Sequence, residues 1–353
     1  MAEPKLICGM NYIPYNELKV KSTRILKAKY PVFDAHGHLG KLVLGDNYDT
    51  LYDIDEVVDI FRSFGIKKVI NLDGFWGEEL DKMLHKTEKY NDNFVVTFGT
   101  VDVSRLDEPG FEDYVYKTLS QSKAKGIKGV KVWKNISLVL RDKNNKKIPF
   151  DDERIDCIFK AAGELGLIVL AHVADPIAFF KPIDMYNERY DELHVRPDWS
   201  FYGDEYFEFW QLMAMQEKVF EQNPRTLFIV AHGGSCSEDL GYVGRCLDKY
   251  PNMYVDFAER ISELGRQPYT SKKFFSQYSD RIVFGTDVNP FNVDYEANFR
   301  FLETYDEYFD YSNKPKPPHG NWKIYGIGLD DDILKKIYYE NIEKLLTQGG
   351  LGK

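Results

Sequence analysis

The chain has 353 residues, with 46 lysines and arginines against 56 aspartates and glutamates, and a formal net charge of −10. This acidity disfavours nucleic acid or an anionic membrane as a partner, because like charges repel each other. An aromatic content of 15% excludes a disordered chain, and no apolar run approaches the roughly 18 residues of a membrane span. We expect a small-molecule substrate and leave homo-oligomerisation open.

The first residues and the cysteines bear on the compartment. Residues 1–8 lack the apolar stretch of a signal peptide. The four cysteines are scattered and form no CxxC pair, so neither a disulfide framework nor a cysteine zinc site is expected. We expect a cytoplasmic location, with earlier removal of a signal peptide as the alternative.

Short β-branched runs alternate along the chain with segments of helical periodicity. The predicted strands are 31–35, 67–72, 94–101, 127–132, 167–171, 226–231, 252–257 and 281–285. Several are apolar throughout, which is typical of parallel strands covered on both faces. The predicted helices are 54–64, 78–90, 110–125, 151–163, 209–222, 239–250, 271–278 and 295–309. Eight strands and eight helices predict an α/β fold, a (β/α)8 TIM barrel rather than an open sheet.

The chain exceeds the length of about 250 residues that is typical of such a barrel. We therefore predict a single domain, 1–353, in which an arm (1–30) and an extension (310–353) flank the barrel (31–309). The extension ends in a C-terminal helix. An insertion, 173–208, follows the fifth strand in an aromatic-rich region, and we expect it to wall the barrel mouth and help exclude water. A satellite core without ligand contact is the alternative.

Metal-capable side chains occur where a barrel carries its active site, at the C-terminal ends of the strands. They are His36 and His38 after the first strand, His172 after the fifth, His232 after the sixth and Asp287 after the eighth. Residues i and i+2 of a strand share a face, so the first two imidazoles can point at one ion. Imidazole and carboxylate together suit zinc, manganese or iron.

This ordered set resembles the amidohydrolase superfamily, and within it the amidohydrolase-related branch, also called amidohydrolase 2, which holds metal-dependent hydrolases, lactonases and decarboxylases. The resemblance covers residues 31–346. It implies that His36, His38, His172 and Asp287 hold a divalent metal, zinc in the first place, with manganese or iron as alternatives. It also implies that Asp287 shuttles the proton of a metal-activated water, and that His232 polarises the scissile carbonyl or ligates a second metal.

Lys131 on the fourth strand leaves the number of ions open. In this superfamily a carboxylated lysine at the end of that strand often serves a second metal. Lys131 is the candidate, because an ammonium in the barrel mouth is costly to desolvate. The alternative is that Lys131 stays an ammonium and holds a substrate carboxylate, so we expect one or two ions.

The candidate substrate-binding residues are Arg260, Arg189, Arg196 and Trp133. An arginine near the mouth can clamp an acidic group with two hydrogen bonds. Arg260 is the best placed because it follows the seventh strand, although a structural ion pair with Glu259 or Asp256 would also explain it. Asp34 shares a strand face with His36, and we interpret it as a buried hydrogen-bond acceptor.

The expected function is that of a metal-dependent hydrolase acting on an amide, ester or lactone bond of a small substrate, for which an acidic one is a candidate. A metal-dependent decarboxylase, a lyase of the same branch, is the first alternative, because the ligand set is shared. A non-catalytic binding protein on the same fold is the second.

Overall fold

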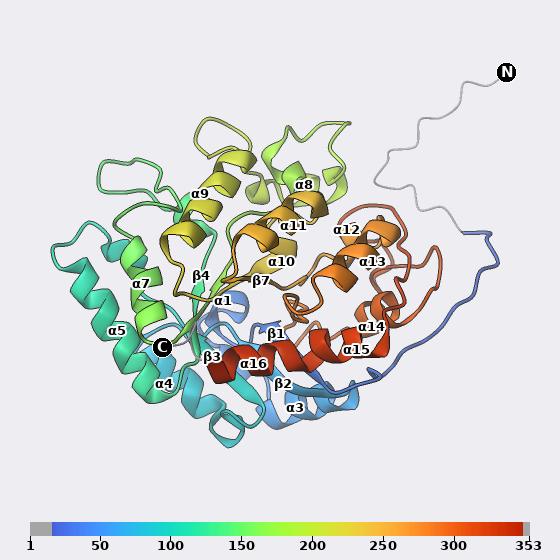
Figure 1. Cartoon of the computed structure of the whole chain (residues 1–353), viewed down its shortest axis with the longest axis horizontal. Helices are drawn as coiled ribbons and strands as arrows, with labels where there is room; N and C mark the ends of the chain where they lie inside the picture. Colours follow the sequence, from blue (N-terminus) through green and yellow to red (C-terminus); the bar gives the residue numbers. More distant parts are fainter. Residues whose placement is uncertain (1–15, 349–353) are drawn as a thin grey trace.

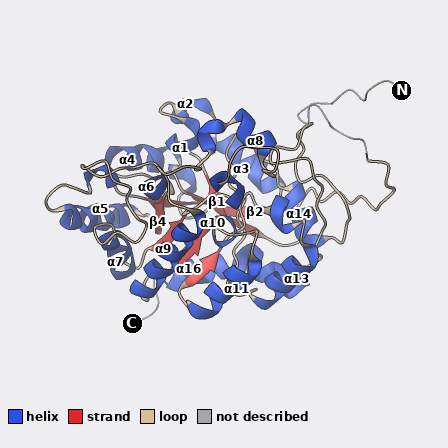
Figure 2. Ribbon diagram, turned by 90° about the horizontal axis from the view of Figure 1, so that it is seen from above, coloured by secondary structure: helices blue, strands red, loops and turns tan. Residues whose placement is uncertain are grey.

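The computed structural model describes residues 16–348, which form an α/β barrel with additions. Seven parallel strands pair in sequence order, and helices surround them (Figure 2). The strands are β1 (Val32–Gly37), β2 (Ile66–Asn71), β3 (Val95–Gly99), β4 (Gly129–Val132), β5 (Ile168–Ala171), β6 (Phe228–Val230) and β7 (Met253–Val255). The predicted barrel is confirmed, and the seven strands fall on the first seven predicted runs.

The eighth predicted run closes the sheet without forming a regular strand. Ile282 makes a parallel bridge to Val255 of β7, and Val288 makes one to Gly37 of β1. Between these bridges the amide of Phe284 donates to the carbonyl of Ile337 at 2.9 Å. That carbonyl belongs to η6 (Lys336–Glu340), a π-helical turn of the C-terminal extension. The extension therefore accepts, through the carbonyl of Ile337, a hydrogen bond that the amide of a regular strand would donate to the neighbouring strand.

Eight longer helices form the outer ring (Figure 1). They are α3 (Ile54–Ser63), α4 (Gly77–Lys86), α5 (Phe111–Lys125), α7 (Asp156–Glu164), α9 (Phe209–Gln222), α11 (Leu240–Lys249), α13 (Pro268–Gln277) and α14 (Glu296–Glu303). Local capping explains several of their bounds. Asp53 caps α3, Glu208 and Gln211 form a capping box on α9, and Gly126 ends α5 at a φ of 115°.

Three of the predicted helices are clearly shorter than expected. The segment 151–163 is helical only from Asp156, as α7. The segment 295–309 is helical only as α14, because Thr304 adopts an extended backbone while its hydroxyl donates to the carbonyl of Arg300 at 2.8 Å. The segment 78–90 divides at Thr87 into α4 and the single 3-10 turn η2 (Glu88–Tyr90).

Shorter helices lie in the loops. They are α1 (Lys41–Leu44), α2 (Tyr48–Leu51), η3 (Val103–Arg105), α6 (Asn135–Leu138), η4 (Ile177–Phe180), α8 (Tyr190–Val195), η5 (Pro197–Trp199), α10 (Ala231–Gly234) and α12 (Ile261–Leu264). The aromatic-rich insertion contains η4, α8 and η5. Phe180 packs there against Phe201 and Phe209, with ring centroids 5.8 and 5.6 Å apart. The insertion therefore packs through its aromatic side chains against its own residues and the start of α9.

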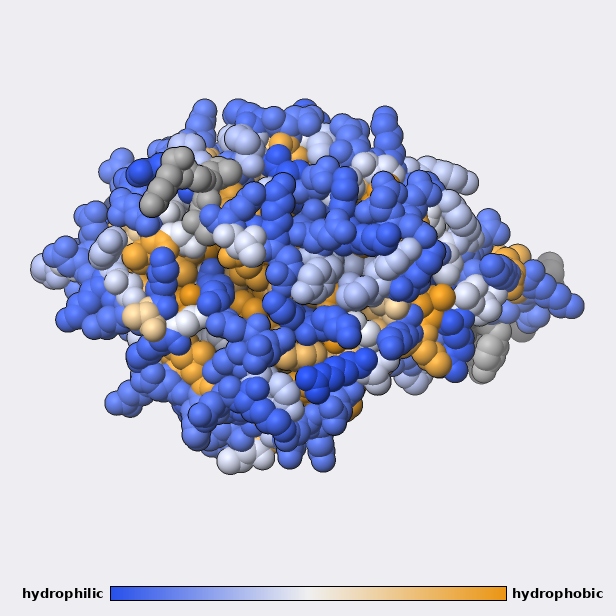
Figure 3. All heavy atoms as spheres, turned by 60° about the horizontal axis from the view of Figure 1, so that its bottom comes forward, coloured by the Kyte–Doolittle hydropathy of each residue, from blue (hydrophilic) through white to orange (hydrophobic). Residues whose placement is uncertain are grey.

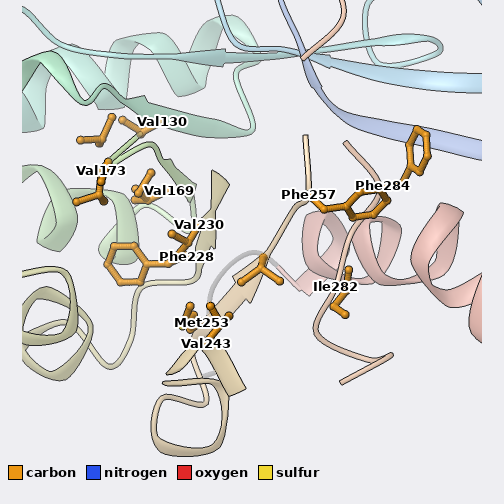
Figure 4. Close-up of a cluster of buried hydrophobic side chains, with 14 of the residues drawn as sticks. Val130, Val169, Val173, Phe228, Val230, Val243, Met253, Phe257, Ile282 and Phe284 are labelled. Carbon is orange, nitrogen blue, oxygen red and sulfur yellow. The ribbon is translucent and has the colours of Figure 1, made fainter. Parts of the chain in front are cut away.

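Two layers of apolar side chains stabilise the barrel. The outer layer lies between the strands and the helices, and Figure 4 shows part of it, including Val130, Val169 and Val230 from neighbouring strands. The inner layer fills the barrel itself with residues such as Phe33 and Leu170. The C-terminal helix α16 (Asn341–Gln348), which follows α15 (Asp331–Lys335) and η6, adds Ile342 and Leu345 to this inner layer.

Of the predicted arm, residues 1–15 lie outside the described residues. The described part runs along the outside of the barrel beside α14 (Figure 1). Thr23 donates its hydroxyl to Asp306 at 2.9 Å, and Arg24 pairs with Glu296 at 3.0 Å. Within residues 16–348, no helix combines the length and the apolar character needed to span a bilayer. Figure 3 shows one face of the molecule, mainly hydrophilic with separate apolar patches.

Candidate metal centre

The predicted histidines and Asp287 meet at one end of the barrel. The Nε2 atom of His38 lies 2.9 Å from Oδ1 of Asp287, and Nε2 of His36 lies 3.6 Å from the same oxygen. Nε2 of His232 lies 3.3 Å from Nδ1 of His172. One ligand atom each of His36, His232 and Asp287 lies within 4.8 Å of the other two. Residues distant in sequence thus lie close together at this end of the barrel.

A bulge in β1 orients His36. The pairing with β2 shifts between Asp34, opposite Val69, and Gly37, opposite Asn71, so β1 carries one extra residue there. The side chains of Asp34 and His36 consequently have separate partners, which corrects the expectation that they share a face. Asp34 accepts hydrogen bonds from the side chains of Thr286 and Tyr295, the latter at 2.9 Å.

The two histidines of β1 are each held by a buried carboxylate. Nδ1 of His36 lies 2.8 Å from Oδ2 of Asp256, and Nδ1 of His38 lies 2.7 Å from Oδ1 of Asp73. An ionised carboxylate only accepts hydrogen bonds, so Nδ1 carries the proton in both rings. Nε2 of His36 is then left with a lone pair, whereas Nε2 of His38 donates to Asp287 at 2.9 Å, because the raised pKa of His38 keeps this ring protonated. Once that proton is released, both rings have the arrangement of a metal-ligating histidine with its supporting carboxylate.

His172 and His232 also each donate one ring N–H to a fixed acceptor. Nε2 of His172 lies 3.2 Å from Oδ1 of Asp175, and Nδ1 of His232 lies 2.9 Å from the carbonyl oxygen of Ala258. Both rings therefore turn their unprotonated nitrogens toward each other at 3.3 Å. Two lone pairs at this distance repel each other unless a cation binds both. Tetrahedral zinc with Zn–N bonds of about 2.0–2.1 Å requires ligand nitrogens about 3.3–3.4 Å apart, so the donor set fits a metal.

The backbone at two of these residues is left-handed. His232 has a φ of 60° and begins a turn through Gly233, Gly234 and Ser235 with φ values of 69°, 70° and 63°. Two of its four residues are glycines, which adopt this conformation without a steric penalty. Asp287 has a φ of 64°. Such conformations cost about 1–3 kcal/mol in other residues and concentrate at functional sites.

Gly285 lets the eighth segment lie against the centre. A Cβ atom at this position would lie 3.1 Å from the Cβ atoms of both His36 and Asp256. That spacing is tighter than nearly all real Cβ contacts, so a side chain here would displace a candidate ligand or its supporting carboxylate.

Burial and charge shift the pKa values of the cluster in opposite directions. Burial lowers the pKa of His172 to about 3. Burial alone would also lower that of His38, but the carboxylates of Asp73 and Asp287 outweigh it and raise the pKa to about 9. For Asp287, burial is outweighed by the neighbouring imidazoles, which hold its pKa well below the usual value.

Lys131 is fully buried beside this cluster. Its Nζ lies 3.5 Å from Nε2 of His36 and 4.8 Å from the ring centroid of Trp133. Burial lowers the pKa of Lys131 to about 8. The amine therefore has a substantial neutral fraction near pH 8, and only a neutral amine can react with carbon dioxide to form a carbamate. Both alternatives for Lys131, carbamate and ammonium, are compatible with this position.

The cluster opens into a large cavity of about 1110 Å³. Apolar side chains from the loops after the first four strands form one part of its wall, among them Val43, Trp76, Val101 and Trp133. The insertion and the C-terminal extension form the other part, with Phe179, Arg196, Lys316 and His319. The insertion thus lines the cavity in addition to covering it.

The three candidate arginines differ in their freedom to bind a ligand. Arg189 is buried, and its two amino groups already pair with Glu192 and Glu263. Arg196 lies at the exposed rim and pairs with Asp198 at 3.2 Å. Arg260 lines the cavity and donates Nη1 to the backbone carbonyl of Glu259 at 2.9 Å. Neither carboxylate considered as its partner holds it, so Arg260 is the most available of the three.

Sequence reasoning missed several residues of this site. Asp73, Asp175 and Asp256 each lie within four residues after a strand, and that position was the available signal. Glu259 and His319 also line the cavity. His319 comes from the extension, where no strand end marks it.

The comparison with protein families decides the affiliation. The family model described as amidohydrolase matches residues 78–347, more than half of the chain. The chain belongs to this family. No curated protein matches the sequence significantly.

Solved structures of amidohydrolase-like proteins share the fold at low sequence identity. A dihydroxybenzoic acid decarboxylase from Polaromonas sp. JS666, solved with manganese and the inhibitor 2-nitroresorcinol, is 12% identical with a TM-score of 0.57, over 90% of this chain and 97% of that one. A 2,6-dihydroxybenzoate decarboxylase from Rhizobium is 14% identical, with a TM-score of 0.55, over 91% and 100%. A putative amidohydrolase from Staphylococcus aureus is 16% identical, with a TM-score of 0.53, over 90% and 99%.

Proposed function

We propose that this protein is a metal-dependent hydrolase of an amide, ester or lactone bond in a small acidic substrate. The observation that carries the proposal is the position of Asp287, whose carboxylate accepts from His38 at 2.9 Å while its side chain stays 29% exposed in the wall of the cavity. A carboxylate so placed can take a proton from a water molecule in the cavity.

The metal would be held by His36, His38, His172 and Asp287, with His232 as a further ligand. A divalent ion in such a site supplies Lewis acidity and lowers the pKa of a water to near neutrality. Zinc is our first choice, because nitrogen ligands in tetrahedral arrangement suit it, with manganese or iron as alternatives. The number of ions depends on whether Lys131 is carboxylated.

Asp287 acts in this proposal as the proton carrier. Its low pKa keeps the carboxylate ionised at neutral pH, so it accepts a proton from the attacking water and returns it to the leaving alcohol or amine. His232 suits a ligand role better than the polarising role, because its proton lies on Nδ1, which donates to Ala258. The nitrogen facing the cluster therefore has no proton to offer an oxyanion.

Decarboxylation is the second candidate, and Lys131 is the observation that favours it. A buried amine 3.5 Å from His36 can hold a substrate carboxylate as an ammonium, and Arg260, which lines the cavity, can hold another acidic group. Asp287 would then take a proton from solvent and deliver it to the carbon that loses carbon dioxide.

One assay separates the two reactions. The zinc- or manganese-loaded protein is incubated with small lactones, esters, anilides and aromatic carboxylates in 18O-labelled water. Hydrolysis places 18O in the product acid, whereas decarboxylation releases carbon dioxide and places a solvent hydrogen on carbon. We expect 18O incorporation. Carbon dioxide release without hydrolysis would establish the second candidate instead.

The Asp287→Asn variant tests the proton carrier itself. We expect kcat to fall about 10²–10⁴-fold, the usual contribution of general acid–base catalysis, with a much smaller change in metal content. The matched control is Asp59→Asn, an exposed aspartate on α3, which should behave as the wild type. An unchanged rate in Asp287→Asn would rule out this role.

A further inference from the structure

The outer wall of the cavity contains a hydrogen-bonded chain from three separate segments. Arg189 at the start of α8 pairs with Glu263 of α12. Ser262 donates its hydroxyl to Oε2 of Glu263 at 2.8 Å, and the same hydroxyl oxygen lies 2.8 Å from Nδ1 of His319 in the extension. Arg189, Ser262 and Glu263 are nearly fully buried. Figure 1 shows α8 and α12 on the same side of the molecule.

The donor and the acceptor in each of these hydrogen bonds can be assigned from the protons that the groups carry. Burial alone would raise the pKa of Glu263, but the charges of Arg189 and Arg260 outweigh burial and hold it below its usual value. Glu263 is therefore ionised and can only accept. Ser262 donates its single hydroxyl proton to Glu263. Its oxygen can therefore only accept a hydrogen bond from His319. The His319 ring thus carries a proton on Nδ1, and in the neutral ring Nε2 presents a lone pair.

The ring of His319 is fixed in place by Tyr311. The two rings stack with centroids 5.5 Å apart and an angle of 19° between their planes. The hydroxyl of Tyr311 accepts from the backbone amide of His319 at 3.0 Å. With Nδ1 bonded to Ser262 as well, the ring is held from its backbone, its face and one edge, so Nε2 has a defined direction.

The free edge of His319 stands beside a second acceptor. Nε2 lies 3.5 Å from Oε2 of Glu259, a residue with a left-handed φ of 54°. Both side chains line the cavity into which Asp287 opens. Two acceptors at this separation form a place for a hydrogen-bond donor, since a hydroxyl or amine in the cavity beside the pair lies within reach of both and can donate to either.

We propose that Glu259 and His319 form a substrate subsite for a hydroxyl or amino group, so that the substrate is a small acid carrying a hydrogen-bond donor at the end remote from the metal centre. The inference rests on the proposed function for the acidic end of the ligand. A second carboxylate is disfavoured at this subsite because Glu259 would repel it. An anion would instead seek Arg260, and the test separates these two recognition modes.

The test measures binding of matched probes to the zinc-loaded full chain by calorimetry. The probes are benzoate, its 3- and 4-hydroxy derivatives, and the dicarboxylates isophthalate and terephthalate. We expect at least one hydroxybenzoate to bind about three- to tenfold more tightly than benzoate, the range of one net hydrogen bond, and neither dicarboxylate to gain. A gain confined to the dicarboxylates, or no gain for any hydroxybenzoate, would overturn the subsite.

Two variants of His319 locate the effect. In His319→Asn the amide reaches the place of Nδ1 and leaves the cavity edge empty, so the hydroxyl gain should disappear while benzoate affinity and metal content stay unchanged. In His319→Gln the amide oxygen reaches the place of Nε2, so part of the gain should remain. His85→Asn, on the exposed face of α4, is the control. Persistence of the full gain in His319→Asn would contradict the proposal.

A measurement without any ligand keeps the subsite separate from the proposed function. Nitrogen-15 NMR of the metal-loaded protein should show His319 as the Nδ1–H tautomer, and Ser262→Ala should abolish this preference. An Nε2–H tautomer or a doubly protonated ring overturns the subsite. Failure of every benzoate to bind, together with the expected tautomer, would instead count against the acidic substrate of the proposed function.

Discussion

The inner and outer parts of the cavity bury charged groups in opposite ways. At the inner end, four imidazoles each donate one nitrogen to a fixed acceptor, Asp256, Asp73, Asp175 or the carbonyl of Ala258. The remaining nitrogens of His36, His172 and His232 face the cluster as lone pairs, and that of His38 donates to Asp287. In the outer wall the buried cation of Arg189 is already neutralised by Glu192 and Glu263.

This difference shows which part depends on an added group. The inner cluster has unpaired donor atoms that only a cation can satisfy, so its stability and chemistry should vary with metal. The outer wall satisfies its charges within the chain, so it should hold its geometry with or without metal. Variants in the two parts should therefore separate metal content from folding stability.

The largest effect is expected from removing two ligands at once. The double variant His36→Ala with His38→Ala should lose stoichiometric metal and reduce turnover by on the order of 10³-fold or more, because the Lewis acid contributes several kcal/mol to the reaction. Metal analysis and circular dichroism check this, and the barrel should stay folded. Retention of one metal per chain would contradict the ligand assignment.

The variant Arg189→Met tests the outer wall, because it removes the closest cation of the buried Glu263 carboxylate and leaves the more distant Arg266, at 3.9 Å. We expect the free energy of unfolding to fall by about 3–5 kcal/mol, the cost of removing one partner of a buried pair, with unchanged metal stoichiometry. Denaturant titration measures the loss. Arg196→Met, at the exposed rim, is the matched control and should change stability by less than about 0.5 kcal/mol. Loss of metal without loss of stability in Arg189→Met would abolish the contrast between the two parts.

A smaller effect is expected from the carboxylate behind His38. Asp73→Asn should lower metal affinity about 10–100-fold, the usual cost of losing such a supporting group, because an amide holds the protonated Nδ1 less firmly. Competition with a chelator of known affinity measures it, with Asp59→Asn as the control. Equal affinities in both variants would mean that Asp73 does not orient His38.

The smallest expected effect is the change of metal affinity with pH. Burial alone would lower the pKa of His38, but Asp73 and Asp287 raise it to about 9 in the metal-free protein. Metal binding must therefore release this proton below pH 9. Apparent affinity should rise by up to about tenfold per pH unit through neutral pH and level off near 9. A pH-independent affinity between 6.5 and 8.5 would show that His38 is not a ligand.

Much of the architecture was predictable because burial leaves a local trace in the sequence. Continuous apolar runs located all seven regular strands. The residues just beyond these runs included the four histidines of the inner cluster, and Asp287 followed the eighth run. The interrupted eighth strand was not predictable, because Ile337, which takes the amide of Phe284, lies 53 residues further along the chain. The bulge between Asp34 and Gly37 was also not predictable, because no residue type in this segment indicates it.

The sequence by itself determined the barrel and the candidate ligands at the ends of its strands, since apolar periodicity and strand-end histidines are properties of short segments. Only the tertiary structure decided which nitrogen of each imidazole carries the proton, which arginine is free, and that His319 faces the cavity. These features depend on partners from distant segments, such as Asp256 for His36 and Ser262 for His319. A hydrogen bond between remote residues depends on how several segments pack together, so the sequence of one segment alone does not predict it.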